Sequence, residues 1–194
     1  MMKLKIILIL LSIFSFYSLP LHAKEIAGVN IPESVSFSEQ STKLVLNGAG
    51  IRTKFIFDIY IGNLYLEKKA HTAEEVYKLH GEKRVSMHFL YGEVDKEKLV
   101  KSWNAGFENN LSEKELAKFK SQINQFNNLF VTVKKGDVIN LNFTPTTGTQ
   151  VVINNKIKGL VEGDDFFTAL LKIWLGEEPA DSDLKEAMLG AKSD

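Results

Sequence analysis

The sequence predicts an α+β fold in which helices cover one face of an antiparallel sheet. Segments with strand character come first, helical segments follow, and a group of short strands precedes two further helices. This grouping, without strict strand–helix alternation, is typical of an antiparallel sheet with its helices on one side. We find no internal repeat and no linker rich in Pro, Gly or Ser in residues 24–194, which indicates a single domain.

The N-terminal part of this region predicts strands. Residues 26–31 are expected to form the first strand and residues 43–46 the second. The second should end at residues 47–50, Asn-Gly-Ala-Gly, because glycine readily adopts the positive φ of a turn. Residues 51–66 are rich in β-branched and aromatic side chains, which predicts one or two consecutive strands.

The middle of the chain predicts helices with one strand between them. Thr72 with Glu75, and Ser112 with Glu115, form capping boxes that begin two helices, the first of which should stop at Gly81. A third helix should begin near Asp95. The apolar residues of the two longer helices recur at helical spacing: Leu99, Trp103 and Phe107, then Leu116, Phe119, Ile123 and Phe126. Residues 84–91 alternate between apolar and polar side chains, which indicates a half-buried strand.

The C-terminal part predicts a meander of strands followed by two helices. Asn154-Asn155 should form a tight hairpin turn, because asparagine tolerates the left-handed conformation. The expected strands cover residues 131–133, 139–143, 150–153 and 156–160, and the expected helices cover residues 166–175 and 182–189.

Residues 1–23 read as a cleavable secretory signal. Lys3 and Lys5 precede an apolar run at residues 6–17, and Ala23 provides a small residue at the expected cleavage site. Pro20 and His22 end the run before it reaches the about 20 residues that span a bilayer. We therefore expect export to the periplasm, cleavage after Ala23 and no stable membrane insertion of the mature chain, residues 24–194.

Composition excludes several functions. The chain has no cysteine, so disulfides, thiol catalysis and thiolate ligation of metals are absent. It carries 24 basic and 24 acidic residues, and loss of Lys3 and Lys5 leaves the mature chain slightly acidic, without the clustered charge that nucleic-acid binding requires. The histidines lack the spacing of a metal site, and no phosphate-binding or nucleotide-binding motif occurs. We therefore expect neither a metal nor a cofactor; the sequence does not indicate an oligomeric state.

Residues 48–66 hold the densest candidate for a binding site. If they form one regular strand, Arg52 and Tyr60 lie on the same face, among apolar neighbours. A guanidinium and a phenol there could hold a carboxylate or a phenolate by charge-assisted hydrogen bonds. Alternatively, Arg52 and Lys54 project into solvent or pair with Asp58, as most strand charges do.

The same segment resembles the chalcone isomerase-like superfamily, and in particular its bacterial exported branch. The resemblance rests on Leu-Asn-Gly-Ala-Gly-x-Arg-x-Lys at residues 46–54 and on Tyr-x-x-x-Leu-Tyr-Leu at residues 60–66. Residues 154–176 give weaker support. The resemblance implies an open-faced β-sandwich, with a cleft between sheet and helices that takes an apolar ligand with an acidic end.

The resemblance also implies ligand-binding residues. The family arginine falls on Arg52, and a position that is threonine in the isomerases and tyrosine in the fatty-acid binders falls on Tyr60. Asn104, or Ser102 as an equal alternative, matches an active-site asparagine, and Thr168 matches a late Thr or Ser. The isomerases' active-site tyrosine has no counterpart in residues 96–104, which argues against ring closure by their mechanism.

Three functions stay open from the sequence. The first is non-catalytic binding of a fatty acid or similar apolar acid or lipid through Arg52 and Tyr60. The second is an intramolecular lyase or isomerase acting on a conjugated ketone, with Arg52 holding an oxyanion. The third is a structural or interaction protein whose own side chains fill the cleft.

Overall fold

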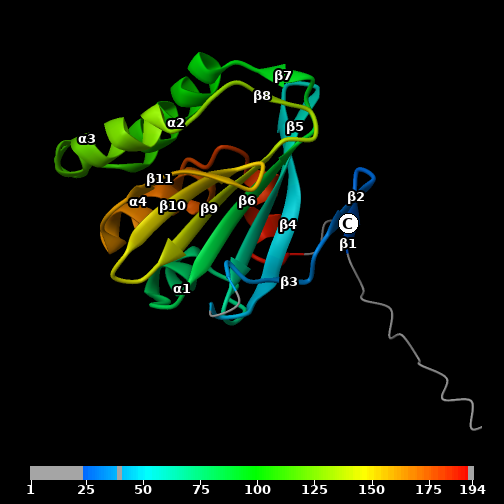
Figure 1. Ribbon diagram of the computed structural model, residues 1–194, viewed down its shortest axis with the longest axis horizontal. Coiled ribbons are helices and arrows are strands. Elements are labelled where there is room, and N and C mark those ends of the chain that lie inside the picture. The colour runs from blue at the N-terminus through cyan, green and yellow to red at the C-terminus, as the bar shows by residue number, and fades with distance from the viewer. Residues whose placement is uncertain (1–23, 39–40, 192–194) are drawn as a thin grey trace, which may run out of the picture.

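A computed structural model describes residues 24–38 and 41–191, so the signal predicted for residues 1–23 lies outside the described residues. Its centre is a seven-stranded antiparallel sheet with the order β11-β10-β9-β6-β5-β4-β3 (Figure 1). The strands are β3 (Ser34–Val35), β4 (Leu44–Lys54), β5 (Phe57–Leu66), β6 (Lys83–Phe89), β9 (Val138–Thr144), β10 (Gly148–Ile153) and β11 (Lys156–Val161). The predicted α+β class and helix-covered antiparallel sheet are confirmed.

Helices cover one face of this sheet. Helix α4 packs against β9 and β10, and α2 packs in turn on α4 (Figure 1). The helices are α1 (Ala73–Lys78), α2 (Lys96–Asn110), α3 (Glu113–Asn128), α4 (Asp164–Leu175) and α5 (Ser182–Met188). The main hydrophobic core lies between the sheet and these helices and includes Trp103, Phe126, Phe166 and Trp174, all essentially buried. Within the described residues, no helix is both long enough and apolar enough to cross a bilayer.

The opposite face of the sheet is partly covered by an N-terminal hairpin. Strands β1 (Lys24–Ile26) and β2 (Val29–Ile31) pair with each other, and Ile31 joins a second, smaller apolar cluster with Leu44, Ile61 and Tyr65. The prediction of one strand over residues 26–31 was wrong, because Ala27 and Gly28 both have positive φ, 48° and 77°, and turn the chain back.

The glycines of β4 do not form the predicted turn. Strand β4 continues from Leu44 through Gly48 and Gly50 to Lys54, and at these glycines α5 lies directly on the sheet. A Cβ on Gly48 would collide with the carbonyl oxygen of Ala187 and would lie 2.8 Å from that of Met188. Close helix approach, not a turn, therefore accounts for glycine at these positions.

Several local predictions are confirmed. The capping boxes at Thr72 and Ser112 form both of their reciprocal hydrogen bonds, and Asn154 and Asn155 adopt φ of 50° and 61° in a hairpin turn. In β6, Val85, Met87 and Phe89 face the core, as alternation predicted. The strand expected at residues 131–133 is shifted, since β8 (Val133–Lys134) pairs with β7 (Glu93–Val94).

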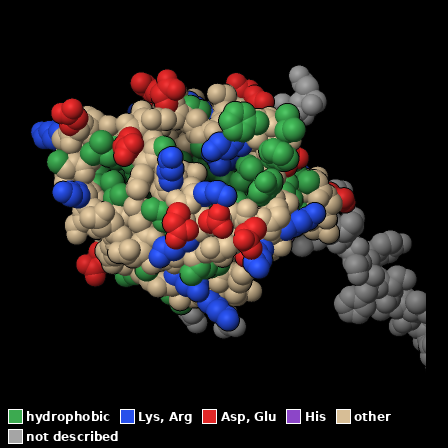
Figure 2. All heavy atoms as spheres, turned by 90° about the horizontal axis from the view of Figure 1, so that it is seen from above, with side chains coloured by type: hydrophobic (Ala, Val, Ile, Leu, Met, Phe, Trp, Pro, Cys, Tyr) green, Lys and Arg blue, Asp and Glu red, His purple; other side chains and the backbone are tan. Residues whose placement is uncertain are grey.

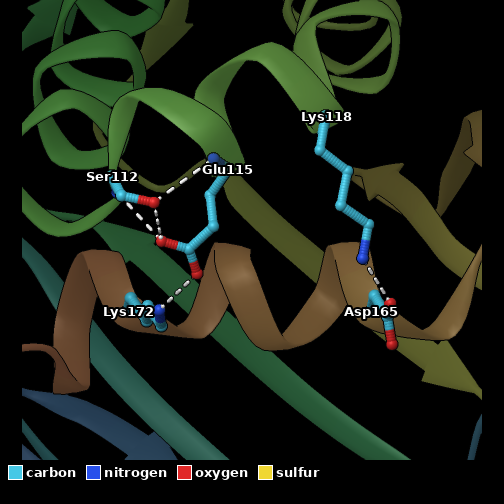
Figure 3. Close-up of polar contacts among 5 residues, drawn as sticks. All are labelled: Ser112, Glu115, Lys118, Asp165 and Lys172. Atoms are coloured by element: carbon cyan, nitrogen blue, oxygen red, sulfur yellow. Dashed lines mark hydrogen bonds and ion pairs between the residues drawn. The ribbon is translucent and has the colours of Figure 1, made fainter.

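Two ion pairs fasten α3 to α4 (Figure 3). Lys172 Nζ lies 3.0 Å from Glu115 Oε1, and Lys118 Nζ lies 2.6 Å from Asp165 Oδ2. Glu115 also accepts hydrogen bonds from the backbone N–H and hydroxyl of Ser112, at 2.9 and 2.8 Å. These hydrogen bonds, with that from Lys172, lower the pKa of Glu115 from its ordinary 4.5 to about 2.

Candidate functional site

Arg52 and Tyr60 face each other across a β-hairpin. The chain turns at Phe55 and Ile56, so residues 51–66 comprise the end of β4, the turn and all of β5, and not one regular strand. Arg52 pairs with Tyr60 in the register of β4 and β5, and directly opposed residues share a face of the sheet. The register shifts just after this pair, which adds Ile59 as a bulge. Bulges of this kind often re-aim side chains beside functional sites.

The Tyr60 ring is buried in the core beneath Arg52. Its exposed fraction is 2%, and the guanidinium carbon of Arg52 lies 5.6 Å from the ring centroid, within the range of a cation–π contact. The indole N–H of Trp174 donates to the Tyr60 hydroxyl oxygen over 2.9 Å. Because this bond uses the oxygen as acceptor, the phenol proton is left for a second partner.

Burial fixes the protonation state of Tyr60. Desolvation raises the pKa of Tyr60 above its ordinary value of 10, against the smaller lowering effects of the Arg52 charge and the Trp174 hydrogen bond. Tyr60 is therefore a neutral phenol at physiological pH. It can donate a hydrogen bond to an anion, whereas a phenolate could not.

A small cavity lies beside this pair, and two of its lining residues carry a buried donor without an acceptor among the described residues. Its volume is about 30 Å³, and its lining includes Arg52, Tyr60, Ser102 and Trp103. Among the described residues, neither Nε of Arg52 nor Nε1 of Trp103 has a hydrogen-bond partner, although both atoms are buried. A buried polar group without a partner costs about 1–3 kcal/mol, so these donors favour a bound acceptor.

A larger, solvent-open pocket adjoins the small cavity. It has a volume of about 510 Å³ and shares Arg52, Ile59, Val94 and Ser102 with it. This volume falls in the range of small-molecule sites. The remaining lining comes from the β4–β5 hairpin, from residues 91–94 and from the exposed side of α2: Lys54, Phe55, Phe57, Tyr91, Glu93, Lys98, Lys101 and Ala105.

The larger pocket beside Arg52 lies at the surface of the molecule. The resemblance implied a cleft between sheet and helices, but aromatic side chains that include Trp103, Phe166, Phe167 and Trp174 are buried in the core between them. Trp103 and Trp174 pack with ring centroids 5.8 Å apart, and Phe143 stacks on Phe167 at 4.9 Å. Of the two pockets beside Arg52, the small cavity is the one that reaches this core, where Tyr60, Trp103 and Ile173 line it.

The four predicted site residues do not all come together. Arg52 and Tyr60 are adjacent, but Asn104 lies between α2 and α3, where its Oδ1 accepts a hydrogen bond from Asn127 Nδ2 at 2.7 Å. Thr168 is half-buried on α4, and neither it nor Asn104 lines the two pockets beside Arg52. Ser102, the alternative to Asn104, lines both. The binding roles of these residues stay predictions.

Sequence reasoning missed other residues at this site. Trp174 is one, because its hydrogen bond to Tyr60 joins residues 114 positions apart and has no local signal. Lys98 and Lys101 could have been found from the helix repeat, since they lie on the exposed side of α2 near Ser102. Within the described part of the chain, no group of three or more His, Asp or Glu residues is placed to hold a metal ion.

Comparison with known proteins agrees with this fold. The crystal structure of a fatty-acid binding protein from Arabidopsis thaliana matches with a TM-score of 0.66 and 19% sequence identity, over 87% of this chain and 95% of that chain. A comparison with curated proteins gives no match. The model of the chalcone isomerase-like family matches residues 23–190, nearly the whole of the predicted mature chain. The chain therefore belongs to the chalcone isomerase-like family.

Proposed function

We propose that this protein binds a fatty acid or a similar apolar carboxylate without transforming it. Arg52 and Tyr60 hold the acid group, and the larger pocket of about 510 Å³ accommodates part of the chain. One observation carries the proposal: the buried Nε of Arg52 has no acceptor among the described residues, directly beside a neutral phenol.

A carboxylate suits these donors. An ionised carboxylate accepts several hydrogen bonds, and a guanidinium is its best bidentate partner. Tyr60 and Trp103 also line the small cavity, and the indole N–H of Trp103 has no hydrogen-bond partner among the described residues. At about 30 Å³ the cavity holds little more than one water molecule, so we expect the acid group to enter it while the hydrocarbon stays in the larger pocket.

The apolar lining supports a hydrocarbon chain. Phe55, Phe57, Ile59 and Val94 border the larger pocket. Each buried methylene contributes about 0.8 kcal/mol before losses, so burial of about ten methylenes of a chain of about 12 to 18 carbons matches the roughly 8 kcal/mol of micromolar affinity. The fatty-acid binding protein of Arabidopsis thaliana with the same fold supports this ligand class.

We also propose that the protein is a member of the bacterial exported branch, with its site in the periplasm. The basic start, apolar run and Ala23 of residues 1–23 support this proposal. Intact mass spectrometry of protein released from the periplasm should give a chain beginning at Lys24. A full-length chain that stays with the cytoplasmic fraction would contradict it.

A structural role is the second candidate, because aromatic side chains fill the core between sheet and helices. The protein would then use the fold as a rigid scaffold, and the donors at Arg52 and Trp103 would be satisfied by water. Such a scaffold binds no acyl chain with defined stoichiometry.

Titration of delipidated mature protein distinguishes the two candidates. Calorimetry with saturated acids of increasing length should give one site per chain and an affinity that rises with length until the pocket is full. Mass spectrometry of lipids that co-purify with the protein should identify acids of the same lengths. Absence of binding for every acid tested would contradict the proposal and favour the scaffold.

A further inference from the structure

The strongest unexplained feature is a group of exposed apolar side chains at the tip of the β4–β5 hairpin. Phe55 is 90% exposed, Ile56 85%, Phe57 49% and Tyr91 39%. We call these four residues the apolar tip. The rings of Phe57 and Tyr91 meet edge to face with centroids 5.5 Å apart, so the tip is one continuous patch. Figure 2 looks down on this end of the molecule and shows hydrophobic side chains gathered beside Lys and Arg side chains, with acidic side chains also on this face.

The backbone conformation of the β4–β5 turn is unfavourable for Phe55. Phe55 has φ of 58° at the first position of a two-residue hairpin turn, as in a type II′ turn, where glycine is preferred. A left-handed conformation costs a bulky side chain about 1–2 kcal/mol. Neither turn geometry nor packing thus explains an aromatic residue here, and strain of this kind is concentrated at functional sites.

Basic side chains lie along one side of the apolar tip. Arg52, Lys54, Lys98 and Lys101 border the adjoining pocket, against Glu93 alone of the acidic residues. Glu93 pairs with Lys134 at 3.3 Å, and Lys98 pairs with Asp95 at 2.9 Å. Within the described residues, Lys54 and Lys101 form no ion pair, so this end of the molecule has positive charge available for an anionic partner.

We propose that the apolar tip docks the protein on an anionic lipid bilayer, with Phe55, Ile56 and Phe57 in the interfacial region and the lysines on lipid phosphates. Aromatic residues with flanking lysines match the chemistry of a membrane interface. The apolar tip exposes on the order of 500 Å², since a large apolar side chain has about 200 Å² of surface. A stable protein interface needs about 800 Å² from each partner, so a bilayer fits better than a protein.

This docking would place the mouth of the pocket against the membrane. Phe55 and Phe57 belong to both the apolar tip and the pocket lining. A ligand could then pass between bilayer and pocket without crossing water. This exchange rests on the proposed function, whereas docking itself does not require a bound fatty acid.

Vesicle flotation of the mature chain tests the docking. We expect binding to phosphatidylcholine vesicles that contain phosphatidylglycerol, weaker binding as salt rises, and little binding to phosphatidylcholine alone. Phe55→Asn should weaken vesicle binding about tenfold or more while leaving the protein at least as stable, because asparagine tolerates the positive φ. Lys158 is an exposed lysine of β11 outside the pocket lining, so the control variant Lys158→Gln should bind vesicles like the wild type.

A reporter at the turn gives an independent measurement. The emission of Phe55→Trp should shift to the blue on adding anionic vesicles, whereas the buried Trp103 and Trp174 of the wild type should not respond. Equal vesicle binding by wild type and Phe55→Asn would overturn the proposal, and so would absence of binding to any vesicle. If the protein instead self-associates in sedimentation experiments, the apolar tip is a contact between two copies of this chain. Fatty-acid titration in detergent-free solution reports the proposed function separately.

Discussion

Replacing Gly48 by alanine tests how α5 is held on the sheet. A Cβ at this position meets the backbone of Ala187 and Met188, which cannot move aside as a flexible side chain could. Helix α5 would have to lift, which disturbs Leu184 and Met188, both essentially buried, and the hydrogen bond from Asn47 Nδ2 to the Met188 carbonyl at 2.8 Å. Full exposure of either side chain costs about 1.5–3 kcal/mol, so partial displacement of both lowers the free energy of unfolding by about 3 kcal/mol.

Urea unfolding followed by far-ultraviolet circular dichroism measures this loss. Gly92→Ala is the matched control, because a Cβ at Gly92 meets nothing within 4 Å and its φ is not positive. It should change the free energy of unfolding by less than about 1 kcal/mol. A Gly48→Ala protein as stable as the control would refute the reasoning that β4 needs glycine for the approach of α5.

Two further predictions concern pH. Hydrogen bonds hold the pKa of Glu115 at about 2, below its unfolded value near 4.5, so its stabilising contribution is present above pH 4.5 and lost as pH falls toward 2. In urea titrations, the free energy of unfolding of the wild type should exceed that of Glu115→Gln by about 1 kcal/mol at neutral pH and by nothing near pH 2. The difference is only about 1 kcal/mol because the pair with Lys172 is partly exposed. A difference that does not change with pH would contradict this prediction. Burial lowers the pKa of Lys83 to about 8 from 10.5, so the unfolded chain binds more protons between these values and stability rises with pH there. Relative to Lys83→Met, the wild type should gain on the order of 2 kcal/mol between about pH 8 and pH 10, and a pH-independent difference would rule out burial of this ammonium as the cause.

Local chemistry made much of the fold predictable. The hydroxyl and carboxylate of each capping box satisfy backbone groups within four residues, so Thr72 and Ser112 mark helix starts without knowledge of the rest of the chain. Asn154 and Asn155 likewise carry their turn preference with them. Alternation in β6 was sufficient to identify its core face.

The errors arose where distant segments decide. Gly48 was assigned to a turn because glycine is common in turns, but it is needed for contact with α5, about 140 positions later in the sequence. For residues 51–66, expected to form one or two strands, the two-strand alternative is correct, but the turn at Phe55 and Ile56 carries no glycine, asparagine or proline and was not located.

The candidate site was only partly predictable for the same reason. Arg52 and Tyr60 were recognised by family resemblance, and the hairpin brings them together as cross-strand partners. The hydrogen bond between Trp174 and Tyr60, and the pairing of Asn104 with Asn127, depend on how helices pack, which local spacing does not encode. The basic side chains beside the apolar tip come from β4 and α2, so the sequence shows no charge cluster.

A cycle of four dissociation constants tests whether Arg52 recognises the acid group of the ligand. Calorimetry would measure a fatty acid and the fatty alcohol of equal length against wild type and Arg52→Gln. We predict that the wild type binds the acid about 10- to 100-fold more tightly than the alcohol, because a charge-assisted hydrogen bond contributes about 1.5–3 kcal/mol. Arg52→Gln should bind acid and alcohol with equal dissociation constants. An equal preference for the acid in both proteins would show that Arg52 does not recognise the acid group.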